Sequence, residues 1–157
     1  MFIQRIGLYK ELVYFCTFIE NYYFCETFRF FKISSMELRN ILLVALGGAI
    51  GSVCRYLISK LSLGTFPWGT FTVNILGSLL IGLLTGLMLR GSVSLEMKLL
   101  LVTGFCGGFT TFSTFANESF SMMRTGDVLL SALYIGVSVV VGVLAVYAGM
   151  HWAEMMK

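Results

Sequence analysis

Four long apolar stretches separated by short loops constrain this 157-residue chain more than any other feature. Crossing about 30 Å of hydrocarbon takes about 20 apolar residues in a helix. Four segments reach that length, at about residues 41–63, 68–89, 99–122 and 128–150. Since 57% of the residues are hydrophobic and 12% are charged, the chain is more apolar than a soluble domain requires. The sequence therefore predicts an all-α, multi-pass protein of the cell membrane with four transmembrane helices.

The short connections between these stretches exclude several classes of function. Loops at 64–67, 90–98 and 123–127 leave no room for a soluble domain, a nucleotide site or a long catalytic loop, so we expect no enzyme. The cysteines lack both the CxxC and the Cys/His spacing of a metal site. A formal net charge of +3 is small and scattered, and it does not indicate binding of nucleic acid.

The first 35 residues differ from the rest of the chain. They are rich in Phe and Tyr, but charges recur so often that no uncharged run could span a membrane. One interpretation is an interfacial helix. The other, which we favour, is that translation starts at Met36, because Met36-Glu-Leu-Arg-Asn40 leads directly into the first apolar stretch. Residues 36–157 then form the four-helix domain.

Positive charges from Met36 onward divide almost evenly between the two sides of the membrane. Arg39, Arg90, Lys98 and Lys157 would share one side, and Arg55, Lys60 and Arg124 the other. Four against three sets no orientation under the positive-inside rule, so we expect the chain to insert both ways up. Residues 1–35, if translated, would add four positive charges to one side. The extension and a free orientation are therefore in conflict.

Small residues recur four apart in three of the predicted helices. These are Gly47 and Gly51 in the first, Ser78, Gly82 and Gly86 in the second, and Gly104 and Gly108 in the third. Such spacings let helix backbones approach closely within a bilayer. They predict helix association, which a plain four-helix bundle would also need.

The third apolar stretch carries an unusual number of polar residues. Its run Gly104–Asn117 holds three glycines, four hydroxyl residues and four phenylalanines, and Glu118 follows. Lipid offers no hydrogen bonds, so these polar groups must face protein or a water-filled path. Helical spacing predicts one aromatic face, made by Phe112 and Phe115, and two polar faces. The first polar face contains Thr111, Thr114 and Glu118, and the second contains Thr110, Ser113 and Asn117.

Isolated polar groups also recur in the neighbouring stretches. They are Asn74 and Ser78 in the second, and Ser131, Tyr134 and Ser138 in the fourth. Each of them alone is more typical of a hydrogen bond between helices than of a conduction site. Together, and with no carboxylate in the third stretch before Glu118, they predict a path for an anion or a neutral solute.

Three motifs in successive predicted helices resemble those of the Fluc (CrcB-type) fluoride channels. They read Gly47-Gly-Ala-Ile-Gly-Ser-Val-Cys-Arg-Tyr56, Pro67-Trp-Gly-Thr-Phe-Thr-Val-Asn-Ile-Leu-Gly77 and Gly104-Phe-Cys-Gly-Gly-Phe-Thr-Thr-Phe-Ser-Thr-Phe115. The resemblance covers about residues 36–152 and does not include residues 1–35. It implies a fluoride-specific channel that lets fluoride leave the cytoplasm passively and so lowers its toxicity.

The resemblance also implies an assembly and a set of site residues. It implies a dual-topology homodimer of antiparallel protomers, with the third helix broken at Gly107-Gly108. One structural Na⁺, which is not transported, would be bound by the backbone carbonyls of Gly107 and Thr110. The implied fluoride pathway, by motif position, contains Asn74, Phe112, Ser113, Thr114, Phe115, Tyr134 and Arg55. Arg55 would attract anions or brace helix ends, and the sequence does not fix the role of Glu118.

Two other classes of membrane protein stay open at this point. A small dual-topology, proton-coupled multidrug antiporter needs a carboxylate in its first helix, and none lies between Arg39 and Lys60. A non-transporting membrane scaffold would need only the small-residue packing. It would leave the polar faces of the third stretch without a role.

Overall fold

The computed structural model describes residues 35–60 and 66–156 of the chain. Our predictions for residues 1–34, and for the end of the first helix at residues 61–63, lie outside the described residues. The chain divides into two units, residues 1–38 and 39–157. The packing described below is that of the second unit by itself.

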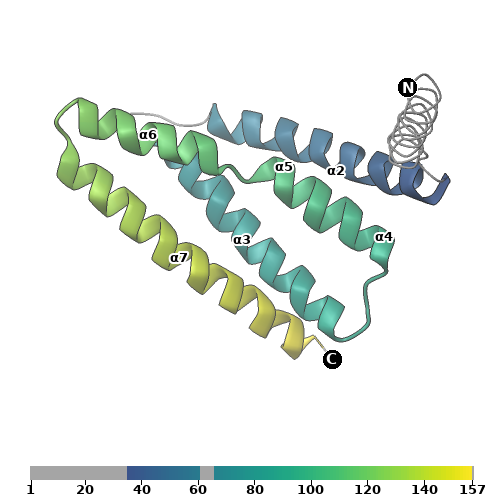
Figure 1. Cartoon of the computed structure of the whole chain (residues 1–157). Coiled ribbons are helices and arrows are strands. Elements are labelled where there is room, and N and C mark those ends of the chain that lie inside the picture. Colours follow the sequence, from purple (N-terminus) through teal and green to yellow (C-terminus); the bar gives the residue numbers. More distant parts are fainter. Residues whose placement is uncertain (1–34, 61–65, 157) are drawn as a thin grey trace, which may run out of the picture. The chain divides into compact units, whose positions relative to one another are not determined.

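All the regular structure in the described residues is helical (Figure 1). The helices are α2 (Ser35–Ser59), α3 (Trp68–Leu89), α4 (Leu95–Met97), η1 (Lys98–Cys106), α5 (Gly107–Phe109), α6 (Phe112–Arg124) and α7 (Val128–Met155). Within residues 35–60 and 66–156, four spans are long and apolar enough to cross a membrane, namely Met36–Ser59, Trp68–Leu89, Leu95–Arg124 and Val128–Met155. The prediction of four transmembrane segments is thus confirmed. The last of them continues to Met155, five residues beyond the predicted end.

Helices α3 and α7 pack against each other along much of their lengths, as Figure 1 shows. Glycines make this approach close enough for backbones to touch. A Cβ atom at Gly82 would lie 2.1 Å from Val146 O, and one at Gly149 would lie 2.2 Å from Leu79 O. Carbon and oxygen cannot approach so closely, so a side chain at either position would push the helices apart.

A second glycine contact joins α2 to the first half of the third span. A Cβ atom at Gly47 would lie 2.1 Å from Leu100 O, and one at Gly51 would lie 2.2 Å from Phe105 O. In the reverse direction, a Cβ at Gly108 would lie 2.4 Å from Gly48 O. The close helix packing predicted from small residues four apart is therefore confirmed within the chain.

The third span is not one continuous helix. It runs through α4, the wider π-type turns of η1, and α5, and then Thr110 and Thr111 are extended, with ψ angles of 159° and 118°. Figure 1 shows this short non-helical segment between α5 and α6.

The predicted break at Gly107-Gly108 is wrong in position, because both glycines are helical. A residue without a side chain is required at position 108 because its backbone packs closely against Gly48. The predicted helical faces are also wrong for Thr110 and Thr111, since neither residue is in a helix.

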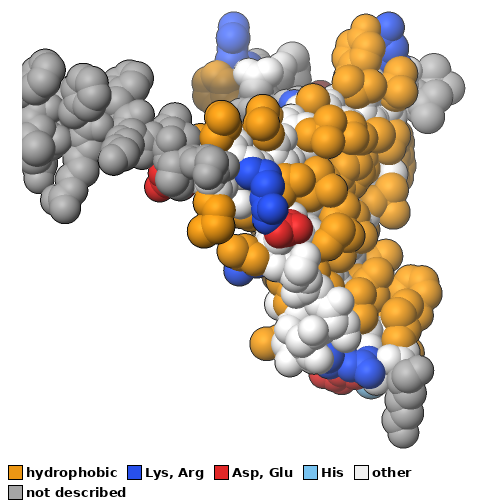
Figure 2. Space-filling view, turned by 90° about the vertical axis from the view of Figure 1, so that its right-hand side faces the viewer, with side chains coloured by type: hydrophobic (Ala, Val, Ile, Leu, Met, Phe, Trp, Pro, Cys, Tyr) orange, Lys and Arg blue, Asp and Glu red, His pale blue; other side chains and the backbone are white. Residues whose placement is uncertain are grey.

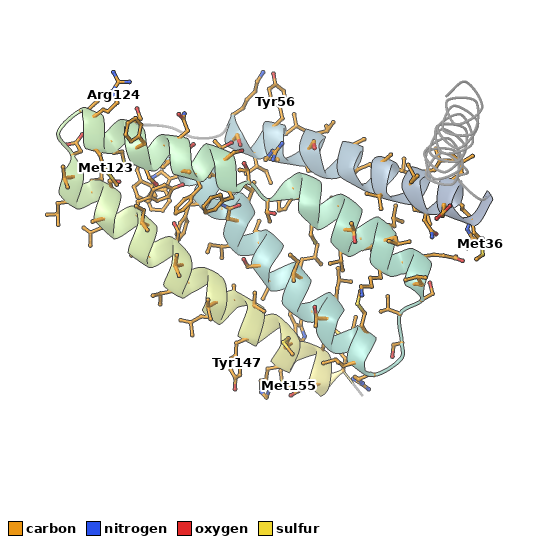
Figure 3. All side chains as sticks on the ribbon, viewed as in Figure 1. Met36, Tyr56, Met123, Arg124, Tyr147 and Met155 are labelled. Atoms are coloured by element: carbon orange, nitrogen blue, oxygen red, sulfur yellow. The ribbon has the colours of Figure 1, made fainter. Side chains whose placement is uncertain are left out.

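Apolar side chains cover most of the face seen in Figure 2. On α7, the exposed ones include Leu129, Val143 and Tyr147, the last of which is 70% exposed and points away from α3 in Figure 3.

Polar contacts hold the ends of the helices. Arg39 pairs with Glu96, and Arg90 donates to the carbonyls of Ala153, over 2.6 Å, and of Met156 at the end of α7. The surface between these ends suits lipid or another apolar partner.

Candidate functional site

The interrupted backbone at Thr110 and Thr111 is the centre of the candidate site. Extended residues within a membrane span release N–H and C=O groups that no helical bond satisfies. In hydrocarbon each unpaired group costs several kcal/mol, so such groups need partners within the protein. The structure supplies these partners from two neighbouring helices.

Asn74 of α3 satisfies both backbone groups of Thr111. Its Nδ2 donates to Thr111 O over 3.1 Å, and Thr111 N donates to Asn74 Oδ1 over 2.8 Å. This reciprocal pair replaces the bonds that a continuous helix would have made. The asparagine that we predicted in the fluoride pathway therefore also braces the break.

Arg55 of α2 binds the neighbouring carbonyl. Its Nη1 donates to Thr110 O over 3.1 Å. A charged donor strengthens such a bond, and the half-buried guanidinium lies at the break rather than free at the surface. Arg55 and Asn74 thus hold consecutive residues of the break from different helices.

The threonine side chains cap the two helix ends that meet at the break. Thr110 Oγ1 donates to Cys106 O over 2.9 Å at the end of α5. Thr111 Oγ1 accepts from Thr114 N over 3.3 Å at the start of α6 and donates to Thr114 Oγ1 over 3.0 Å. Sequence reasoning missed Thr111 as a helix N-cap. A threonine three residues before a second polar residue was the available signal.

Glu118 lies in the second turn of α6, where two hydroxyls bind its carboxylate. Thr70 Oγ1 of α3 donates to Glu118 Oε1 over 2.7 Å, and Tyr134 OH of α7 donates to Glu118 Oε2 over 3.0 Å. Thr70 and Tyr134 are almost fully buried, at 3% and 1% exposure. The three residues link three helices. Sequence reasoning placed Tyr134 in the site but missed Thr70.

The two predicted pathway phenylalanines have different surroundings. The ring centroids of Phe112 and Phe115 lie 6.1 Å apart, and that of Phe115 lies 5.0 Å from Tyr134. Phe112 is 79% exposed, whereas Phe115 is half-buried. An aromatic ring left this exposed on a membrane span has room for a partner other than its own chain.

A cavity of about 310 Å³ lies beside the break. Its lining comes from α3, the break, the first turn of α6 and α7, and consists of Asn74, Ser78, Ile81, Thr110, Thr111, Phe112, Phe115, Ser138 and Val139. It thus contains three of the seven predicted pathway residues. Arg55 contacts the break and Tyr134 contacts Phe115 and Glu118, but neither is in this lining. Ser113 and Thr114 are exposed on the first turn of α6.

Ser138 is a further polar residue of the cavity. Among the described residues, its Oγ is buried with no hydrogen-bond partner. A buried hydroxyl without a partner loses about 1–3 kcal/mol relative to a satisfied one. The sequence grouped Ser138 with Ser131 and Tyr134 on one face of the fourth helix but did not single it out.

Backbone oxygens are candidate ligands for a cation at this site. In residues 35–60 and 66–156 no group of three or more His, Cys, Asp or Glu side chains could bind a metal ion. The Thr111 N–H that would close a helical bond to Gly107 O donates to Asn74 instead. Gly107 O therefore lies near a helix C-terminus, where carbonyls carry partial negative charge. Hard cations prefer such oxygen ligands.

Thr110 O is a less favourable cation ligand than Gly107 O. It already accepts from the positive guanidinium of Arg55, although a carbonyl has two lone pairs. The donor chemistry of Gly107 and Thr110 thus fits a small hard cation, and Arg55 would reduce the affinity.

Comparison with known proteins gives one consistent result. Residues 42–150 match the family described as "CrcB-like protein, Camphor Resistance (CrcB)". A protein of Agrobacterium fabrum named "Fluoride-specific ion channel FluC" is 54% identical over 116 residues, which cover 71% of this chain and 93% of that protein. A protein of the same name from Bacteroides fragilis is 46% identical over 127 residues, covering 76% of this chain and all of the relative.

Proposed function

This chain belongs to the CrcB-like family, and from that premise we propose that it is a fluoride-specific ion channel of the cell membrane. The observation that supports this most directly is the cavity beside the break in the third span. Polar donors, aromatic rings and a helix N-terminus meet there within a membrane-spanning segment. A structural scaffold would have no use for this arrangement.

Fluoride is small and strongly hydrated, so a channel must replace its water with hydrogen-bond donors. Asn74 keeps one N–H beyond the one that it gives to Thr111 O, and the Ser138 hydroxyl has no partner among the described residues. Both residues line the cavity. We expect these two groups to donate to the ion.

The first turn of α6 borders the same cavity through Phe112 and Phe115. Free N–H groups and the helix dipole make a helix N-terminus favourable for an anion. Aromatic ring edges are also electropositive. Contacts of this kind are weak enough for an ion to leave again, which conduction requires. Ser113 and Thr114 add hydroxyls on this turn.

We further propose that two chains assemble as an antiparallel, dual-topology homodimer. The nearly even division of positive charge in residues 36–157 supports this orientation. The exposed ring of Phe112 leaves room for a second protomer. One structural Na⁺ would be held by Gly107 O, to which Thr111 N makes no helical bond, and by the second lone pair of Thr110 O, in both protomers. Fluoride would leave the cytoplasm passively, which lowers its toxicity.

Efflux from proteoliposomes tests the proposed function. The full chain is reconstituted with internal fluoride or chloride, and each anion is followed outside with a selective electrode after the membrane potential is clamped. We expect rapid release of fluoride and no chloride release above that of protein-free liposomes. Equal release of both anions would contradict fluoride specificity. Dependence of fluoride release on a proton gradient would contradict a passive channel and favour an antiporter.

A further inference from the structure

Thr110 is fixed on several sides at the end of α5. Its Oγ1 and its backbone N each donate to Cys106 O over 2.9 Å, and its carbonyl accepts from Arg55. The part of Thr110 that takes no part in these bonds is the side-chain methyl, Cγ2. That methyl lies against Gly77 of α3.

Gly77 has no room for a side chain because of this methyl group. A Cβ atom at Gly77 would lie 2.2 Å from Thr110 Cγ2 and 3.4 Å from Phe109 Cδ1. Two carbons prefer a separation of about 3.5–4.0 Å. Gly77 is also buried, so an added methyl group would not reach open space.

Neither side of this contact can yield without loss. Threonine carries its methyl and its hydroxyl on one χ1 torsion, so turning the methyl away would take Oγ1 from Cys106 O. Moving α3 away would instead strain the Asn74–Thr111 pair, since Asn74 lies three residues before Gly77 on the same helix face. A side chain at residue 77 would therefore disturb the break by either route.

We propose that Gly77 is a positioning residue of the channel, which seats the Thr110 methyl group and thereby fixes the direction of the Thr110 carbonyl. The inference rests on the fluoride channel function proposed above. It assigns Gly77 no contact with the ion. Its effect passes through the backbone of the break.

Substitutions on both sides of the contact test this role. Gly77→Ala adds the clashing Cβ, Thr110→Ser removes the methyl and keeps the hydroxyl, and the double variant combines them. Gly142→Ala on α7 is a matched control, because a Cβ there would meet Ser78 Oγ at an ordinary 3.7 Å. Fluoride efflux is measured per assembled protein, together with the melting temperature in detergent.

We expect Gly77→Ala to slow fluoride efflux by about tenfold or more, as an overpacked contact would. Thr110→Ser removes the seated methyl at a residue of the proposed Na⁺ site, so its own flux is measured and serves as the reference for the double variant. The double variant should conduct within about threefold of Thr110→Ser alone, because coupled neighbours are not additive. A rescue of this kind is not expected if residue 77 only loosens the bundle in general.

Two results would overturn the proposal. These are wild-type flux in Gly77→Ala and a double variant that conducts no faster than Gly77→Ala. If Gly77→Ala does not assemble, recovery of assembly and melting temperature by Thr110→Ser becomes the test, and no recovery would count against it. A wild-type protein without selective fluoride efflux would contradict the proposed function, while the melting temperatures would still test the pairing of Gly77 with Thr110.

Discussion

At the scale of single residues, Asn74 uses both polar atoms of its amide on the backbone of Thr111. Asn74→Ala would leave a buried N–H and a buried C=O without these partners, each at a cost of about 1–3 kcal/mol. We therefore expect Asn74→Ala to lower the melting temperature as well as the fluoride flux. Thermal unfolding in detergent and liposome efflux measure the two effects.

Asn74→Asp separates the two parts of this role. The aspartate keeps an acceptor for Thr111 N but places a carboxylate opposite Thr111 O and beside an anion path. Its flux should fall below that of Asn74→Ala. An Asn74→Ala variant that melts like the wild type and loses only flux would show that the amide serves the ion and not the backbone.

Phe112 and Phe115 should respond differently to the same substitution. Phe112 is exposed, so Phe112→Ile should leave the stability of the chain unchanged, whereas Phe115→Ile loses a ring contact with Tyr134 and should lower it. Both should slow fluoride passage by orders of magnitude, since an aliphatic side chain has no electropositive ring edge. Efflux and thermal unfolding are compared for the two variants. Wild-type flux in both, with normal assembly, would remove the aromatic rings from the mechanism.

At the scale of helices, the adjacent glycines of α5 have opposite surroundings. A Cβ at Gly108 would lie 2.4 Å from Gly48 O, whereas one at Gly107 would meet no described atom within 4 Å. Gly108→Leu should therefore disrupt the packing of α2 on α5 within each chain. Gly107→Leu should leave the chain folded and block only the approach of a second protomer.

Cross-linking and size-exclusion chromatography in detergent distinguish these outcomes. We expect Gly108→Leu to express poorly or unfold at lower temperature, and Gly107→Leu to run as a folded monomer without fluoride flux. A Gly107→Leu variant that still dimerises and conducts would argue against an interface at this glycine.

The helices differ in how far the sequence alone could predict them. The four spans follow from the length of the apolar stretches, which depends on local composition only. The break could not be placed in the same way. Glycine pairs suggest interruption, yet Gly108 is helical and Thr110 and Thr111 are extended, because Arg55 and Asn74, distant in the sequence, supply the compensating hydrogen bonds.

The site residues show the same division. The family motifs identified Asn74, Phe112 and Phe115 as site residues, and all three line the same cavity. Thr70 was missed, and the sequence named Thr111 and Ser138 without distinguishing their roles, because a hydroxyl looks the same in the sequence whether it binds Glu118, caps a helix or faces a cavity. These three roles differ only in which neighbour the hydroxyl faces, and that depends on how each helix is rotated about its own axis in the packed structure.

At the scale of the whole molecule, the proposed Na⁺ site belongs to two chains at once. Replacing Na⁺ on both sides of the liposome membrane with a large organic cation such as N-methylglucamine should abolish fluoride flux, because the Gly107 carbonyls of both protomers would lose their proposed partner and unpaired carbonyls in hydrocarbon cost several kcal/mol. Restoring Na⁺ should restore the flux. Undiminished flux after exchange long enough to empty a buried site would contradict a structural Na⁺.

The braces of the break also bear on how the protein is made. The chain leaves the ribosome from its N-terminus, so Arg55 and Asn74 are synthesised before Thr110 and Thr111. An interrupted segment entering lipid alone would bring costly bare peptide groups with it. Here the side chains that bind those groups are made first, and the newest segment can complete its hydrogen bonds against helices that are already in place.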